Sequence, residues 1–183
     1  YSEKILEAAH ISVETIDLSE ILGRIAKLSD KDKNVQDKLQ SLKHYIPVND
    51  VPEEALVKMA KFAFVVEDWV CSLDLDGTAI QCWTSLQEHF GIMPCTVMSM
   101  MSESLRPSAC EVDIAGTLSM YALQLASGTP SALVDWNNNY ADDPDKCVLF
   151  HCGNWPKSFY GEDVKMAYAD VLATTLGQKN TYG

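Results

Sequence analysis

Residues 131–151 have the sequence SALVDWNNNYADDPDKCVLFH. Two short apolar runs in this stretch end at polar residues, the first at Asp135 and the second at His151. Short apolar runs that are bounded by turn residues are typical of buried strands. The stretch therefore predicts two strands, 131–135 and 147–151, and each strand delivers a reactive side chain at its carboxyl end.

Upstream of this stretch, other strand-like runs alternate with segments whose apolar residues recur every three or four positions, as they do on a helix. Alternating strands and helices are the signature of a parallel sheet that helices cover on both faces. The predicted fold class is therefore α/β, in three layers. The predicted sheet has about five parallel strands, near 12–16, 78–82, 96–100, 131–135 and 147–151. Helices are predicted over 30–45, 52–72, 85–90 and 162–176, with others after Asp17 and after Glu111.

The composition is that of one globular domain. The chain has 183 residues, 47 % of them hydrophobic, and a formal net charge of −12. Such an acidic balance disfavours nucleic acid and anionic membranes as partners, whereas an uncharged, polyhydroxylated substrate would fit. No apolar run approaches the length of a membrane span, and none resembles a signal peptide.

Six cysteines are present, and no pair has the C-x2-C spacing of a zinc site. Most of them lie in apolar or strand-like runs, as buried free thiols do. Free thiols of this kind indicate a reducing compartment, so we expect a cytoplasmic protein.

Glu111 joins Asp135 and His151 as a candidate site residue. Right-handed crossovers would put Asp135 and His151 at the same carboxyl edge of the sheet, and Glu111, just before a helix, can reach that edge. Two carboxylates and an imidazole are suitable ligands for a divalent cation. Each also has a structural alternative: a helix dipole for Glu111, a turn for Asp135 and a buried hydrogen bond for His151. Asp113 is better placed than Glu111 for the structural task at the helix start.

Polar and aromatic residues near the predicted strand ends are candidates for substrate binding. Gln81 and Ser99 could hydrogen-bond sugar hydroxyls, and Trp83 or Trp136 could stack on the face of a sugar ring. Asn137 follows Trp136 in a polar run that begins directly after an apolar strand. Packing is the alternative role for each of them.

Taken together, these residues resemble the L-fucose/L-arabinose isomerase family of metal-dependent sugar isomerases. The resemblance covers essentially the whole chain, and its last three segments are specific in this order. It is carried by residues 79–83, 95–99, 110–114, 133–139 and 151–156.

The resemblance implies an aldose–ketose isomerase that uses a divalent metal, usually Mn²⁺ or another divalent cation. In the family, two carboxylates bind the metal and flank the carbons that exchange a proton through an enediol. Glu111 and Asp135 occupy those positions, as catalytic and metal-binding residues, and His151 matches a further histidine as a metal ligand. An Asp at the second position favours the fucose-like branch, although an L-arabinose-like sugar is also implied.

The resemblance also implies a domain plan. Residues 1–130 would form a Rossmann-like α/β middle domain of a sugar isomerase. Residues 131–183 would carry the second acid and lead into a β-rich carboxyl-terminal domain. Family members are longer than this chain and oligomeric, so we expect the fragment alone to be inactive and the full-length protein to be a homo-oligomer.

Two other interpretations remain open. The chain could be a non-catalytic sugar-binding or assembly module, which an isomerase assay with added Mn²⁺ would distinguish. It could instead be a thiol-based metal protein that uses Cys82, Cys110 and Cys152, which its zinc content would test.

Overall fold

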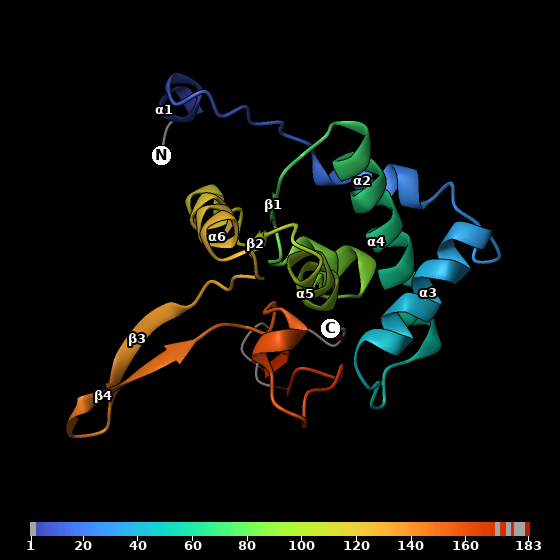
Figure 1. Ribbon diagram of the computed structural model, residues 1–183. Helices are drawn as coiled ribbons and strands as arrows, with labels where there is room; N and C mark the ends of the chain where they lie inside the picture. Colours follow the sequence, from blue (N-terminus) through green and yellow to red (C-terminus); the bar gives the residue numbers. More distant parts are fainter. Residues whose placement is uncertain (1–2, 171–172, 175–176, 178–181) are drawn as a thin grey trace.

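The structure is a computed structural model that describes residues 3–170, 173–174, 177 and 182–183. The described chain mixes helices with short strands (Figure 1). Its helices are α1 (Glu3–Ala8), α2 (Leu18–Ile25), α3 (Lys33–Tyr45), α4 (Glu53–Ser72), the π-helix η1 (Leu86–Phe90), α5 (Cys95–Glu103), α6 (Ile114–Ser127) and the 3₁₀ turn η2 (Lys157–Phe159). Its strands are β1 (Thr78–Ile80), β2 (Ser108–Cys110), β3 (Asp135–Tyr140) and β4 (Asp143–Phe150).

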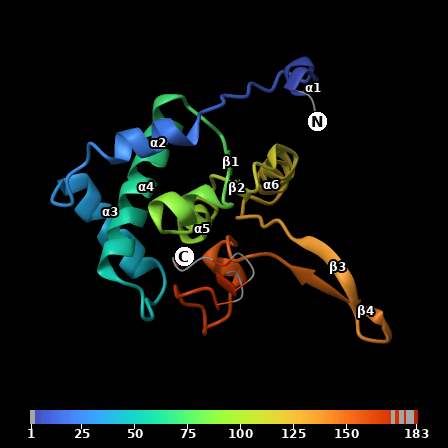
Figure 2. The same cartoon turned by 180° about the vertical axis from the view of Figure 1, so that it is seen from behind.

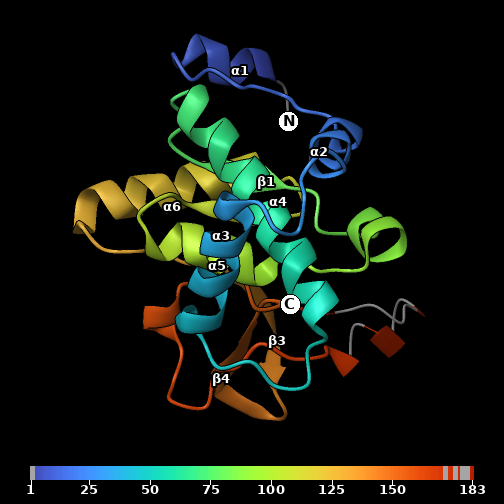
Figure 3. The same ribbon diagram turned by 90° about the vertical axis from the view of Figure 1, so that its right-hand side faces the viewer.

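Helix α4 is the centre of the larger hydrophobic core. Pro52 precedes its first turn, and Glu53 and Glu54 lie in that turn, where acids suit the positive end of the helix dipole. Helices α2 and α3 pack against α4, and Figure 3 shows α4 running past both of them. The buried side chains of α4 include Leu56, Met59, Phe62 and Val66. Their spacing of three and four residues places them on one side of the helix, which therefore organises this core.

Strands β1 and β2 form a parallel pair in the middle of the molecule. Their register pairs Thr78 with Ser108 and Ile80 with Cys110. Helix α5 lies on the chain between the two strands and packs on β2, and α6 packs on both strands. In Figure 1 the pair accordingly lies between α5 and α6. The two strand ends, followed by residues 81–84 and 111–113, therefore meet at one edge.

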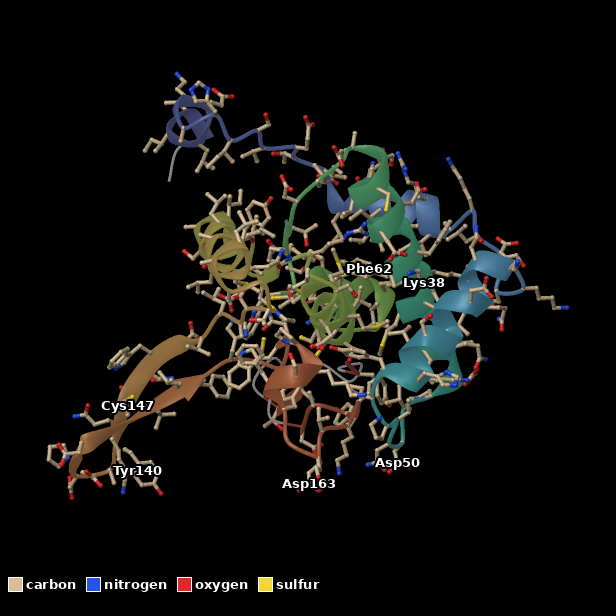
Figure 4. The ribbon with its side chains drawn as sticks, in the orientation of Figure 1. Lys38, Asp50, Phe62, Tyr140, Cys147 and Asp163 are labelled. Carbon is tan, nitrogen blue, oxygen red and sulfur yellow. The ribbon has the colours of Figure 1, made fainter. Side chains whose placement is uncertain are left out.

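Strands β3 and β4 form an antiparallel hairpin that projects away from the helices (Figures 1 and 2). All six residues of β3 are exposed, and the Trp136 side chain is 81 % exposed. Figure 4 shows Tyr140 and Cys147 on this projecting arm, far from Phe62 on α4. Asp135 pairs with Phe150 at the base of the hairpin, the end opposite its tip at residues 141–142.

The predicted mixture of helices and parallel strands is confirmed, but the predicted five-stranded parallel sheet is wrong. The described residues form one parallel pair and one antiparallel pair. Residues 12–16 form neither helix nor strand in the described chain, although their apolar and polar residues alternate. Residues 96–100 lie in α5. The strand prediction failed here because a short run that is buried on almost every side has no periodicity to separate a helix from a strand.

The two strands predicted in 131–151 are also corrected. The first strand starts at Asp135 instead of ending there, and it pairs antiparallel with β4. The polar run after Asp135 therefore forms strand rather than loop, because a hairpin exposed on both faces needs no apolar face. The helix predicted over 162–176 lies partly outside the described residues, and residues 164–169 are not helical but contain an isolated bridge from Met166 to Val48.

The predicted helices 30–45 and 52–72 are confirmed as α3 and α4, and 85–90 as η1. Within the described part of the chain, no helix combines the length and the apolar character that crossing a bilayer requires.

The core around α4 gives a first prediction. Phe62 is fully buried, so Phe62→Ala should lower the free energy of unfolding by about 3–5 kcal/mol through the lost apolar contacts and the cavity. Urea denaturation followed by circular dichroism measures this difference. Phe159→Ala is the matched control, because Phe159 is 52 % exposed and its loss should change stability by less than about 0.5 kcal/mol. Equal effects of the two substitutions would contradict the placement of this core.

Candidate functional site

Glu111 lies in a strained turn directly after β2. Its φ is 61° and that of Val112 is 57°, so two consecutive non-glycine residues adopt the left-handed conformation. The exposed Glu111 carboxylate accepts a hydrogen bond from the Trp83 indole N–H, with 3.1 Å between Nε1 and Oε1. Backbone strain of this kind clusters at functional sites, where the surrounding structure fixes it.

The turn is held from both sides. The Val112 N–H donates to the Ile80 carbonyl at 3.3 Å, which extends the contact between the two strand ends. Asp113 caps α6, and its carboxylate accepts from the Gly116 N–H at 2.8 Å. Asp113, rather than Glu111, therefore performs the structural task at this helix start, as predicted, and the Glu111 side chain takes no part in the cap.

Asp135 and His151 meet at the base of the β3–β4 hairpin. Asp135 pairs with Phe150, and His151 is the next residue along the chain. The antiparallel pairing, not the shared edge of a parallel sheet, brings them together. Asp135 is exposed, whereas the His151 side chain is about half buried.

The electrostatics of His151 connect the three candidate residues. A hydrogen bond with the Cys152 sulfur raises the pKa of His151 above its ordinary value, and partial burial opposes this shift. The negative charges of Asp135 and Glu111 also raise the His151 pKa. Both carboxylates therefore lie within electrostatic reach of the same imidazole, which links the turn after β2 to the base of the hairpin.

The three side chains are not assembled into a tight ligand set. The ligand atoms of Glu111, Asp135 and His151 do not all lie within 4.8 Å of one another, the spacing at which a group of described residues could hold a metal ion. In addition, His151 Nδ1 already accepts the backbone N–H of Cys152 at 2.9 Å. Its Nε2 is thus the ring nitrogen that remains for a further partner.

The group that does meet this criterion is a set of thiols. The sulfur atoms of Cys95, Cys110 and Cys152 all lie within 4.8 Å of one another. Hydrogen bonds from the Cys110 and Cys95 thiols hold the pKa of Cys152 well below its ordinary range, and the bond to Cys152 raises the pKa of Cys110. Cys95 joins the cysteines that the sequence had singled out; no spacing in the chain indicated it.

The proposed substrate-binding residues lie in different surroundings. Gln81 and Trp83 follow β1 beside Glu111, and the Gln81 amide donates to the Trp83 carbonyl. Trp136 and Asn137 are exposed on the projecting strand β3. Of these four, Trp83 is the residue with a direct bond to a candidate carboxylate.

Ser99 does not end a strand as expected. It lies inside α5 and is buried, since the segment is helical. Its hydroxyl contacts the Tyr45 hydroxyl at 2.8 Å and also donates to the Trp155 carbonyl. Both of these partners belong to the protein, so the Ser99 hydroxyl serves packing between α3, α5 and the segment after β4.

The segment after His151 is anchored by residues that sequence reasoning did not assign to the site. The buried Asn154 side chain donates to the Ser108 carbonyl at 3.3 Å, and the Trp155 indole donates to the Leu133 carbonyl at 3.0 Å. Tyr160 stacks on Trp155 with 6.0 Å between the ring centroids. These contacts hold the segment after β4 against β2 and against the residues that precede β3. The run Gly-Asn-Trp-Pro at 153–156 was the available signal, because it concentrates large or amide side chains in a short loop.

No family model matches the chain. The chain is 28 % identical over 152 residues to a sulfoquinovose isomerase of Priestia megaterium, which covers 82 % of this chain and 33 % of that protein. It is 28 % identical over 142 residues to a sulfoquinovose isomerase of Alkalicoccus urumqiensis, with 77 % and 31 % covered. It is 23 % identical over 156 residues to one of Clostridium sp. (strain MSTE9), with 82 % and 33 % covered.

The chain spans about a third of the length of the curated relatives that it matches. These relatives are sugar isomerases by name, which supports the resemblance at that general level. They do not show membership of the L-fucose/L-arabinose isomerase family in particular.

The cap that holds the Glu111 turn gives a second prediction. A methyl group at Gly116 would lie 2.5 Å from the Asp113 carboxylate and 2.6 Å from a Leu133 methyl. Gly116→Ala should therefore lower the free energy of unfolding by about 1–2 kcal/mol, as loss of a helix cap does. Gly23→Ala is the control, because nothing lies within 4 Å of its added methyl, and this helical site should gain about 0.5–1 kcal/mol. Urea unfolding midpoints of the two variants that shift in the same direction would contradict this account of the cap.

Proposed function

We propose that this chain is part of an aldose–ketose isomerase in which Glu111 and Asp135 are the proton-transferring carboxylates. The observation that carries the proposal is that the hairpin pairing sets Asp135 opposite Phe150, next to His151, while the turn after β2 presents the Glu111 carboxylate beside Trp83. The similarity to proteins named sulfoquinovose isomerase supports the reaction class. The proposed substrate is an aldose, either an L-fucose- or L-arabinose-like sugar or sulfoquinovose.

A divalent cation such as Mn²⁺ suits the donor set chemically. Glu111 and Asp135 offer exposed carboxylate oxygens, and His151 offers Nε2, a combination that Mn²⁺ accepts. When bound, the cation would polarise the sugar carbonyl and lower the cost of negative charge on its oxygen. Because the three groups are not preassembled, we propose that they close around the cation when the sugar binds.

The carboxylates supply the base. One of them removes the proton from the carbon beside the carbonyl, and the electron pair of that C–H bond forms the enediol double bond. The same or the other carboxylate returns the proton to the former carbonyl carbon, while a hydroxyl proton moves between the two oxygens. Atoms and electrons balance without a redox cofactor, as an isomerisation requires.

Neighbouring residues position this chemistry. Trp83 orients the Glu111 carboxylate through its indole N–H, and Gln81 lies in the same turn. We propose that Trp83 and Gln81 contact the sugar, and that Trp136 and Asn137 do so if the hairpin folds towards it. The exposed hairpin, with Trp136, Leu149 and Phe150, also agrees with a homo-oligomer of the full-length protein, since large apolar side chains gather there.

The proposal predicts the effect of removing each charge. In the full-length polypeptide with Mn²⁺, Glu111→Gln and Asp135→Asn should each lower kcat/KM for the aldose by about 100-fold or more, because each removes a base and a ligand charge. Conversion of L-fucose, L-arabinose and sulfoquinovose to their ketoses is the measurement. Circular dichroism should show an intact fold in both variants, because both side chains are exposed.

Glu162→Gln and Asp142→Asn are matched controls, because both acids are exposed and Asp142 lies at the far tip of the hairpin. Both should keep the parent kcat/KM. Near-normal turnover in Glu111→Gln or Asp135→Asn would mean that the chemistry belongs to another carboxylate. A full-length parent that converts none of the three sugars, yet binds one of them, would favour a non-catalytic sugar-binding module.

Trp83→Phe separates positioning from chemistry. The substitution keeps an aromatic ring but loses the N–H that donates to Glu111. Loss of one hydrogen bond should lower kcat by about tenfold, with a smaller change in KM. A higher KM with an unchanged kcat would mean that Trp83 contacts the sugar but does not position Glu111.

A further inference from the structure

We infer that Cys95, Cys110 and Cys152 form a structural zinc site that Cys82 completes. The inference does not depend on the isomerase reaction. It rests on the convergence of thiols from separate segments onto one point inside the fold.

The geometry of the three sulfur atoms fits a zinc site. They lie within 4.8 Å of one another. A tetrahedral site with Zn–S bonds of about 2.3 Å has sulfur atoms about 3.8 Å apart. Each sulfur–sulfur distance therefore has to shorten by about 1 Å at most for the ion to bind. Small rotations of the cysteine side chains can supply this change.

Cys82 supplies the fourth thiol. It is buried in one cluster with Cys110, against which Cys152 also packs, and it hydrogen-bonds with Cys110. Its sulfur lies outside the set that is mutually within 4.8 Å, so it has to turn towards the ion to complete the site. The four cysteines come from four parts of the chain: the segment after β1, the first turn of α5, the last residue of β2 and the segment after β4. Four thiolates around zinc make the closed coordination of structural sites, in which no position is left for a substrate.

Ordinary packing accounts for the cluster less well. A single buried cysteine behaves as a small apolar side chain and needs no ligand. Here three of the six cysteines of the chain have sulfur atoms within 4.8 Å of one another, and a fourth, Cys82, packs in a cluster with Met98 and Cys110. The Met98 sulfur lies 3.9 Å from the Cys110 sulfur. The other two, Cys71 and Cys147, are exposed elsewhere. A pocket lined by sulfur favours a soft or borderline ion such as Zn²⁺ over Mn²⁺.

The site would also order the candidate carboxylate and imidazole. Cys110 directly precedes Glu111, and Cys152 directly follows His151. An ion held by these two thiols would tie the turn after β2 to the base of the hairpin. Removal of the ion should loosen both the turn and the hairpin base, because the short β1–β2 pair alone does not hold them together.

The test uses the full-length polypeptide, purified with a reductant and without added metal. Elemental analysis should find about one zinc per chain. Replacement by Co²⁺ should give the near-ultraviolet thiolate-to-cobalt absorption and the visible bands of a tetrahedral site. Cys95→Ser and Cys110→Ser should each lower the zinc content at least tenfold, whereas Cys71→Ser and Cys147→Ser, the exposed controls, should keep it.

Three results would overturn the inference: a chain without zinc that takes up neither Zn²⁺ nor Co²⁺, full zinc content in both buried-cysteine variants, or a disulfide between Cys95 and Cys110 in non-reducing peptide maps. If the serine variants do not fold, the cobalt spectrum of the unaltered protein decides alone. Isomerase activity is measured separately, so an inactive protein with one zinc per chain would contradict only the proposed reaction.

Discussion

The parallel pairing of β1 with β2 is the constraint on which the rest of the site depends. Three residue pairs set its register, and Ile80 lies opposite Cys110. This register places the residues after β1, including Trp83, beside the turn that holds Glu111. Thr117 of α6 fastens the same pair, because its hydroxyl donates to the Thr78 carbonyl at 2.9 Å. A shift of one residue would reverse the facing of every side chain and would separate Trp83 from Glu111.

The β3–β4 hairpin is held at its base and not along its strands. Its base is fixed by contacts of Asn154 and Trp155 with Ser108 and Leu133, while its strands are exposed along their length. Asp135 and His151 occupy the fixed end, and Trp136 lies on the exposed strand beyond it. The two halves of the candidate site are therefore held by two devices, a buried strand pair for Glu111 and an anchored hairpin base for Asp135 and His151.

Part of this arrangement could be predicted from the sequence. Amphipathic spacing identified α3 and α4, because one side of each helix is buried. It failed at residues 96–100, since a segment buried on all sides has no polar face to mark a helix. The strand after Asp135 was missed because its residues are polar throughout, and pairing within a hairpin does not require apolar side chains. The convergence of Cys95 with Cys110 and Cys152 depends on the tertiary fold alone, so no local sequence pattern predicts it.

Thiol sulfur atoms and carboxylate oxygens, two kinds of metal donor, lie close together in the chain near the strand ends but differ in burial. At the end of β2, the buried residue is Cys110 and the next, exposed residue is Glu111. After β4, His151 precedes Cys152, whose sulfur belongs to the inner group. At the end of β2, the thiol of Cys110 thus faces the interior and the carboxylate of Glu111 faces the solvent, one residue apart. Because thiolates prefer soft or borderline ions and carboxylates prefer harder ones, the proposed zinc and Mn²⁺ sites would not compete for the same cation.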